Sequence, residues 1–146
     1  MPQEITRMAV AARAAARQLA VCSNAERNAA LEAIAEALAN NQETILAANA
    51  EDVSRAEEGV AAGELSPPLL KRLKLAGKKF DTTLTMVRSV RDQQDPLGRT
   101  LAATELAPEL ELYRVSVPIG VIGVIFESRP DALVQIAALA LKSGNA

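Results

Sequence analysis

The chain has no histidine and no tryptophan, and it has one cysteine, Cys22, among 146 residues. Without histidine it lacks the most common acid–base group and metal ligand of proteins. A single cysteine forms no internal disulfide, which favours a reducing, cytoplasmic location. Aromatic residues make up 2% of the chain, and alanine supplies much of the 49% that is hydrophobic. This composition favours helices with thin apolar faces.

Neither sign of charge dominates the chain, and it has no long hydrophobic run. Lysine and arginine total 16 and aspartate and glutamate total 18, a net charge of −2. This balance argues against non-specific nucleic-acid binding, which needs a basic surface. No stretch reaches the roughly 18 consecutive apolar residues of a membrane span. The Ala- and Arg-rich N-terminus carries Glu4 and lacks the apolar core of a secretory signal, so we interpret it as a structural helix.

Two helices are predicted before residue 46. Residues 4–20 repeat apolar side chains at helical spacing. Ser23 and Glu26 then form a capping box, in which each side chain bonds to the other's backbone N–H. The apolar positions of the second helix begin at Leu31 and continue at helical spacing as far as Ile45.

Two further helices are predicted up to residue 98. A third, shorter helix is expected over about 49–60. Ser66 is the expected cap of a fourth helix, with Pro67 in its first turn, and apolar residues continue at steps of three and four to Val87. Gly77 is expected to weaken this fourth helix locally.

The composition changes at the turn sequence DPLG, residues 95–98. Beyond it, residues 100–106 and 109–117 are expected to be extended runs joined at Ala107-Pro108. Apolar and charged residues alternate in the second run, as in a strand with one face in water. These two runs therefore predict a strand pair.

Residues 117–146, VPIGVIGVIFESRPDALVQIAALALKSGNA, have the pattern of a buried strand, a polar turn, a buried helix and a stop. Residues 117–126 are nearly all apolar, as in a central strand, and Pro118 lies where a missing N–H is tolerated. Pro130 suits the first turn of a helix, and the segment ending at Gly144 suits its end. The segment therefore predicts the first strand and crossover helix of a parallel α/β sheet whose second strand the chain lacks.

The turn at Glu127, Ser128 and Arg129 is the candidate site. Ligands of open α/β sheets bind beyond the carboxyl ends of strands, and helix N-termini favour anions. Arg129 suits a bidentate grip on phosphate or carboxylate. In the alternative interpretation Ser128 only caps the helix and Arg129 pairs with Glu127 or Asp131.

Three other motifs in the sequence are not interpreted as ligand or catalytic sites. Gly120 and Gly123 lie inside the predicted strand, whereas a dinucleotide fingerprint puts its glycines in the turn that follows. Cys22 is interpreted as a buried, inert thiol, because no histidine or tight basic cluster lies near it in the sequence. The basic stretch over residues 71–79 is expected to be a solvated helix face.

Several motifs resemble one enzyme family. Residues 117–146, with the ESRP turn and the LKSGNA helix end, resemble gamma-glutamyl phosphate reductase, also called glutamate-5-semialdehyde dehydrogenase, a branch of the aldehyde dehydrogenase superfamily. RNAALEAIAEAL, ILAANAEDV, LKRLKL and ELELYRVSVPIGVIG also resemble this family, in the expected order. The resemblance covers the whole chain as an N-terminal portion, and it implies a Rossmann-like cofactor domain of aldehyde dehydrogenase type.

The resemblance also implies a reaction. NADPH would reduce L-glutamyl 5-phosphate to L-glutamate 5-semialdehyde in proline biosynthesis. A cysteine thiolate would displace phosphate to form a thioester, which hydride then reduces. The family's cysteine lies beyond this chain and Cys22 does not match its position, so no catalytic residue is expected here.

Site residues follow from the same resemblance. Backbone at Ile125, Phe126 and Glu127 is expected to contact NADP. Ser128 falls near an oxyanion-stabilising asparagine of general aldehyde dehydrogenases, and Arg129 is expected to steady the substrate phosphate or carboxylate.

The expected organisation has three parts: residues 1–98 as N-terminal helices, 99–117 as an oligomerisation arm, and 118–146 as the truncated start of the Rossmann-like core. Expected partners are L-glutamyl 5-phosphate, further copies in a homo-oligomer and, by coupling, glutamate 5-kinase. No metal, nucleic acid or membrane partner is expected. The alternatives are a stand-alone helical binding or assembly module, and an enzyme that uses Cys22.

Overall fold

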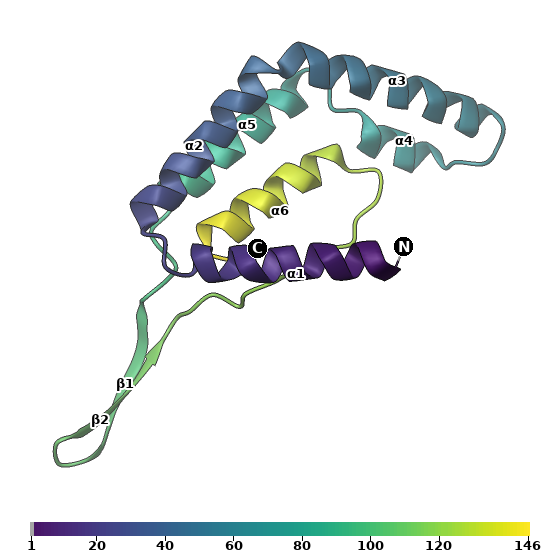
Figure 1. Ribbon diagram of the computed structural model, residues 1–146. Coiled ribbons are helices and arrows are strands. Elements are labelled where there is room, and N and C mark those ends of the chain that lie inside the picture. The colour runs from purple at the N-terminus through teal and green to yellow at the C-terminus, as the bar shows by residue number, and fades with distance from the viewer. Residues whose placement is uncertain (1) are drawn as a thin grey trace.

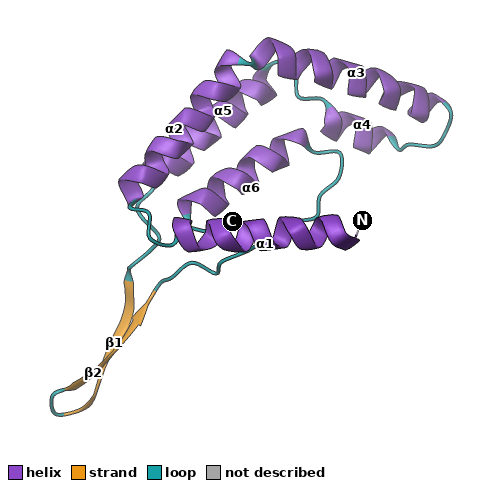
Figure 2. Ribbon diagram, viewed as in Figure 1, coloured by secondary structure: helices purple, strands orange, loops and turns teal. Residues whose placement is uncertain are grey.

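The computed structural model describes residues 2–146, which form six helices and one two-stranded antiparallel sheet. Helices α2, α5 and α6 pack together, α3 and α4 extend from one end of this group, and the hairpin projects from the other (Figure 1). Most of the described chain is helical, and within residues 2–146 strands occur only in the hairpin (Figure 2). In chain order the elements are α1 (Pro2–Leu19), α2 (Asn24–Asn40), α3 (Gln42–Ala61), α4 (Pro67–Leu73), α5 (Lys78–Asp92), β1 (Thr100–Ala107), β2 (Leu110–Val115) and α6 (Pro130–Lys142).

The core lies between α2, α5 and α6. Its buried members are small or aliphatic, and fully burying one leucine contributes about 1.5–3 kcal/mol. Half-buried aliphatic side chains extend the core at its edges, Ile34 and Leu38 among them. The predicted thin apolar faces are thus confirmed for these helices. The buried cluster is Leu31, Ala35, Val87, Val90 and Ala138.

The start of α2 is as predicted. Ser23 Oγ accepts a hydrogen bond from the Glu26 backbone N–H at 3.2 Å, and the Glu26 carboxylate accepts one from the Ser23 N–H at 2.7 Å. The third helix differs from the prediction, since it starts at Gln42 rather than about residue 49 and runs to Ala61. Only Asn41, with φ −108° and ψ 15°, separates it from α2.

The predicted fourth helix is two helices. The chain leaves α4 at Lys74, which is extended, and enters α5 after Gly77, whose φ of 65° is left-handed. Asn49 of α3 holds this break: its side chain donates to the Leu73 carbonyl and accepts from the Leu75 N–H, both at 2.9 Å. These tertiary hydrogen bonds hold open the break in the single helix that the spacing of the apolar residues predicted. Ser66 also differs from the prediction, because its side chain makes no cap bond to α4.

The predicted strand pair is confirmed as the hairpin β1–β2, with Ala103 opposite Tyr113. Every position of both strands is exposed. Both faces of the hairpin are therefore in contact with solvent, whereas the prediction placed only one face in water. Ser116 closes its base: the Ser116 hydroxyl donates to the Pro96 carbonyl at 2.7 Å and accepts from the Arg99 N–H at 3.0 Å.

Residues 117–127, the extended run, lie outside any helix or strand and make almost no strand hydrogen bonds. Ile122 N–H donates to the Ala146 carbonyl at 2.8 Å, and Ala146 N–H donates to the Gly120 carbonyl at 2.9 Å. This pair of bonds is one rung of a parallel ladder. The prediction that 117–126 is buried is wrong for this chain, since Ile125 is 100% exposed. The physical reason is that, among the described residues, only Asn145 and Ala146 form hydrogen bonds with this run, and open hollows separate it from α1 and α6.

The predicted final helix is confirmed as α6, which ends at Lys142, and Gly144 follows its C-cap residue Ser143. Gly144 has a φ of 69°, and a Cβ there would lie 2.9 Å from Leu97 Cδ1 and 3.0 Å from Pro118 Cγ. The helix is not buried all round as predicted, because Leu133 and Leu139 are more than half exposed. Within residues 2–146, no helix is both long and apolar enough to span a membrane.

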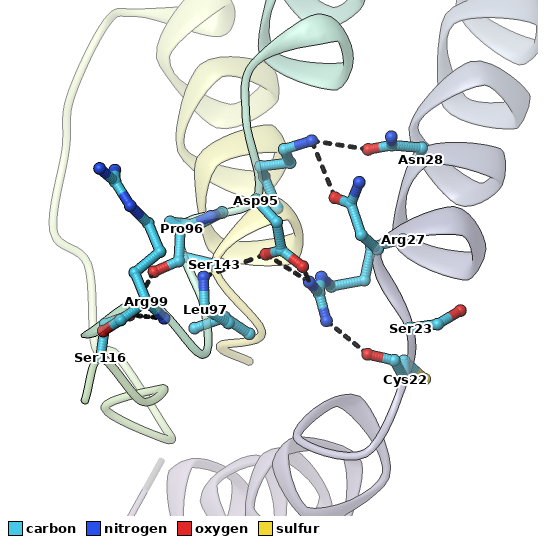
Figure 3. A network of polar contacts seen from close by, with 12 residues as sticks. Cys22, Ser23, Arg27, Asn28, Asp95, Pro96, Leu97, Arg99, Ser116 and Ser143 are labelled. Atoms are coloured by element: carbon cyan, nitrogen blue, oxygen red, sulfur yellow. Dashed lines mark hydrogen bonds and ion pairs between the residues drawn. The ribbon is translucent and has the colours of Figure 1, made fainter. Parts of the chain in front are cut away.

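A polar network joins α2, α5 and α6 at the hairpin end of the core (Figure 3). Arg27, 3% exposed, donates from one nitrogen to both carboxylate oxygens of Asp95 at 2.7 Å and from another to the Cys22 carbonyl. Lys142, also 3% exposed, donates to Asn28 Oδ1 and to the carbonyl of Arg91, both at 2.8 Å. Burial lowers the pKa of Lys142.

Candidate functional site

The candidate site is the turn between the extended run and α6. Ser128 has a φ of 52°, a left-handed conformation that turns the chain from the run into the helix. Pro130 occupies the first helical position, where its fixed φ is favourable and its missing N–H has no helical partner to lose. The turn therefore lies at the end of the extended run and at the N-terminus of a 13-residue helix, as predicted.

Of the two local roles predicted for this turn, the structure shows the ion pair of Arg129 but not the helix cap of Ser128. Arg129 Nη2 lies 3.3 Å from Asp131 Oδ2, so the predicted local ion pair is present. This contact is long for a charge-assisted bond and Arg129 is 49% exposed, so it contributes less than about 1 kcal/mol. The alternative in which Ser128 caps α6 is wrong, since the N-cap residue is Arg129 and no side chain caps the helix. Arg129 is thus only weakly held by Asp131.

The predicted cofactor-contact residues Ile125, Phe126 and Glu127 lie together on the exposed run. Among the described residues, the backbone N–H and C=O groups of residues 123–128 have no hydrogen-bond partner. Exposed, unpaired backbone groups at the end of a run beside a helix N-terminus are able to bind the polar groups of a ligand. The role of these three residues stays a prediction.

A basic hollow adjoins the turn. It has a volume of about 480 Å³ and is lined by Arg129 and Asp131 together with Arg72 and Lys79. Arg72 lies on α4 and Lys79 on α5, and Figure 1 shows α4 beside the loop that leads into α6. Sequence reasoning treated both residues as part of a solvated face. No helical spacing could have joined them, because the break between α4 and α5 puts Arg72 and Lys79 on different helices.

Cys22 lies far from this turn. Its carbonyl accepts from Arg27, and the neighbouring residue Asn24 accepts from Lys142 at the C-terminal end of α6. The turn is at the other end of α6, and a 13-residue helix is about 20 Å long. The Cys22 thiol donates to the Gln18 carbonyl at 3.3 Å and is half-buried rather than buried as predicted. The geometry therefore argues against the interpretation in which Cys22 acts at this site.

No group of three or more Cys, Asp and Glu side chains suited to a metal ion occurs in the part of the chain that the structure describes. The charged lining of the basic hollow is mainly cationic, with three basic side chains and one carboxylate. Such a lining suits an anionic ligand.

The chain is similar to known proteins over nearly its whole length. It is 57% identical over 136 residues to the gamma-glutamyl phosphate reductase of Natronomonas pharaonis, which covers 93% of this chain and 31% of that protein. Among solved structures, the gamma-glutamyl phosphate reductase of Saccharomyces cerevisiae matches with 42% identity and a TM-score of 0.90, over 96% of this chain and 35% of that one. The same enzyme from Thermotoga maritima matches with 37% identity and a TM-score of 0.82, over 92% of this chain and 32% of that one.

These matches confirm the predicted fold class, an N-terminal set of helices with part of an α/β sheet. No protein-family model matches the chain. The chain spans about a third of the length of the relatives it matches. In sequence and in fold, the chain is similar to the N-terminal portion of the gamma-glutamyl phosphate reductases.

Proposed function

We propose that this chain forms the N-terminal portion of a cytoplasmic reductase of proline biosynthesis, which converts L-glutamyl 5-phosphate to L-glutamate 5-semialdehyde. The observation that carries the proposal is the 57% identity to a gamma-glutamyl phosphate reductase across 93% of the chain. The basic hollow beside the turn supports it, because an acyl phosphate substrate is anionic.

The turn residues are proposed to bind the substrate and the cofactor. Arg129 holds an anionic group of the substrate by charge-assisted hydrogen bonds, displacing its weak contact with Asp131. The free backbone of Ile125, Phe126 and Glu127 holds the cofactor, which we propose to be NADP, and this cofactor supplies hydride when it is bound. The backbone of residues 123–128 fits such a ligand because none of its polar groups is already used within the described chain.

The chain by itself is proposed to be inactive. The reaction needs a thiolate that displaces phosphate, and the one thiol present, Cys22, lies at the opposite end of α6 from the turn. The hairpin is proposed to be the oligomerisation arm of the complete enzyme. All positions of its strands are exposed, and it projects away from the helices (Figure 1). Its outer edges are free to pair with another copy.

A chimera tests the proposal. This chain replaces the matching segment of the Saccharomyces cerevisiae reductase, the solved relative with a TM-score of 0.90. The reaction is followed in reverse, as NADP⁺ reduction with glutamate 5-semialdehyde and phosphate. We expect the chimera to be active and the isolated chain to be inactive.

Within the chimera, Arg129→Ala tests the turn. We expect it to raise the apparent KM for substrate about tenfold or more, since a hydrogen bond to a charged group is worth about 1.5–3 kcal/mol. Arg13→Ala, an exposed cation on α1, is the matched control and should leave KM unchanged. A correctly folded chimera without activity, or an unchanged KM in Arg129→Ala, contradicts the proposal.

A further inference from the structure

The basic hollow contains one cation whose donors are entirely unused. The Arg72 guanidinium makes no hydrogen bond or ion pair with any described residue, although it carries five N–H donors. It lies 57 positions before Arg129 in sequence, yet both side chains line the same hollow. The break between α4 and α5 decides this placement, because it sets the direction in which α4 approaches the turn.

The other two cations of the hollow are already engaged. Lys79 Nζ donates to the carbonyls of Lys74 at 2.8 Å, Lys71 at 3.1 Å and Arg72 at 3.4 Å, which uses all three of its donors. Lys79 therefore fixes the C-terminal end of α4 and thereby the backbone that carries Arg72. Arg129 has one partner, Asp131.

We propose that Arg72 and Arg129 together form a two-guanidinium clamp for an oxyanion of the substrate, with Lys79 as a positioning residue. Two guanidinium groups that line one hollow repel each other, and a bound anion offsets this repulsion. A phosphate or carboxylate also matches the planar fork of each guanidinium, which makes two parallel hydrogen bonds. Asp131 balances only one of the three cations, so the hollow keeps a net positive charge.

The inference rests on the proposed function only for the identity of the substrate. The oxyanion is either the phosphoryl group or the α-carboxylate of the glutamyl group. Both have the same recognition chemistry, and kinetics distinguish them, because in the reverse reaction phosphate and glutamate 5-semialdehyde are separate substrates.

The first test uses the chimera described above, with Arg72→Ala, Arg72→Lys and the control Lys71→Ala. Lys71 is an exposed cation on the same helix that does not line the hollow. We expect Arg72→Ala to raise one KM about tenfold to a hundredfold, and Arg72→Lys to raise it less, since lysine keeps the charge but not the fork. A raised KM for phosphate identifies the phosphoryl group, and a raised KM for the semialdehyde identifies the carboxylate. Equal KM values in Arg72→Ala and Lys71→Ala overturn the clamp.

The second test does not depend on catalysis. Inorganic phosphate or acetate is titrated into the purified 146-residue chain at constant ionic strength, and the arginine side-chain N–H signals are followed by NMR. We expect saturable shifts for Arg72 and Arg129, and loss of the Arg129 shift in Arg72→Ala but not in Lys71→Ala. If the chimera is inactive while these shifts are seen, the proposed reaction fails and the clamp stands. If no saturable shift occurs, the clamp is refuted independently of the proposed reaction.

Discussion

The ion pair between Arg27 and Asp95 is the contact whose loss we expect to destabilise the chain most clearly. The two charges join α2 to the segment after α5, across 68 positions of sequence. Arg27 is 3% exposed, whereas the Asp95 side chain is 33% exposed. Asp95 also accepts a hydrogen bond from the Leu97 N–H at 3.0 Å, so one carboxylate holds both the arginine and the start of the hairpin.

Asp95→Asn keeps the shape of this side chain and removes its charge. Breaking a fully buried pair costs about 3–5 kcal/mol, because one charge is left uncompensated. Water reaches a third of Asp95, and an asparagine oxygen still accepts from Arg27, so we expect a loss of about 2 kcal/mol. For a chain of 146 residues this corresponds to a melting temperature lower by about 4–8 °C. Thermal unfolding followed by circular dichroism measures it.

The control is Asp52→Asn, which breaks the Arg55–Asp52 pair on α3. Both of its side chains are at least half exposed and lie three residues apart on one helix. Such a pair contributes about 0.5 kcal/mol or less, so its loss should shift the melting temperature by no more than about 2 °C. Equal shifts in the two variants would falsify the claim that burial makes the Arg27–Asp95 pair important.

The same pair makes a pH prediction. Burial alone raises the pKa of Asp95, but the Leu97 N–H and the positive charges of Arg27 and Lys142 together hold it below its ordinary value. A carboxylate with a lowered folded-state pKa stabilises the fold fully above its unfolded value of about 3.9, and this stabilisation is lost as the pH falls through the folded value. The difference in stability between the native chain and Asp95→Asn should therefore be constant from about pH 7 to pH 5 and shrink below about pH 4. A difference that does not shrink in acid refutes the electrostatic explanation.

Two further predictions concern the α6 end of the chain. Gly144→Ala should lower the free energy of unfolding by about 2–3 kcal/mol, because alanine disfavours a φ of 69° and its Cβ would contact Leu97. The control Gly63→Ala, with a φ of 77° and open space around it, should lower it by only about 1 kcal/mol. Equal melting temperatures of the two variants would contradict this. The exposed apolar run is expected to make the chain self-associate, because Ile125 within it is 100% exposed. Ile125→Lys should therefore reduce self-association in sedimentation velocity, whereas Val21→Lys, at 85% exposed but apart from that run, should leave it unchanged.

Local signals predicted most of the element order. The capping box at Ser23, the turn at residues 95–98, the strand pair and the helix from Pro130 to Lys142 all agree with the structure. Each depends on residues within a few positions of one another, so sequence spacing is enough to find them. The turn at Arg129 was found for the same reason, since a polar turn between an apolar run and a helix start is a local pattern.

The errors in prediction arose where distant residues decide the structure. Helical spacing predicted one helix from Pro67 to Val87, but Asn49 binds the backbone at its middle and holds it open. The run at residues 117–126 has a buried-strand pattern, but burial depends on the strands and helices that lie beside it, and few of these belong to the described chain. A sequence pattern shows which structure a segment is suited to form, and the segments packed against it decide whether that structure forms.

The sequence by itself determined the resemblance to the gamma-glutamyl phosphate reductases, most of the order of elements and the position of the ESRP turn. Motifs and capping signals are local, so they can be read without the fold. Only the tertiary structure showed that Arg72 lies beside Arg129 at the basic hollow, and that Arg27 and Lys142 join three helices. The physical reason is that these contacts depend on how α2, α4, α5 and α6 pack. Packing brings together charges that are more than fifty positions apart, at spacings for which no sequence pattern exists.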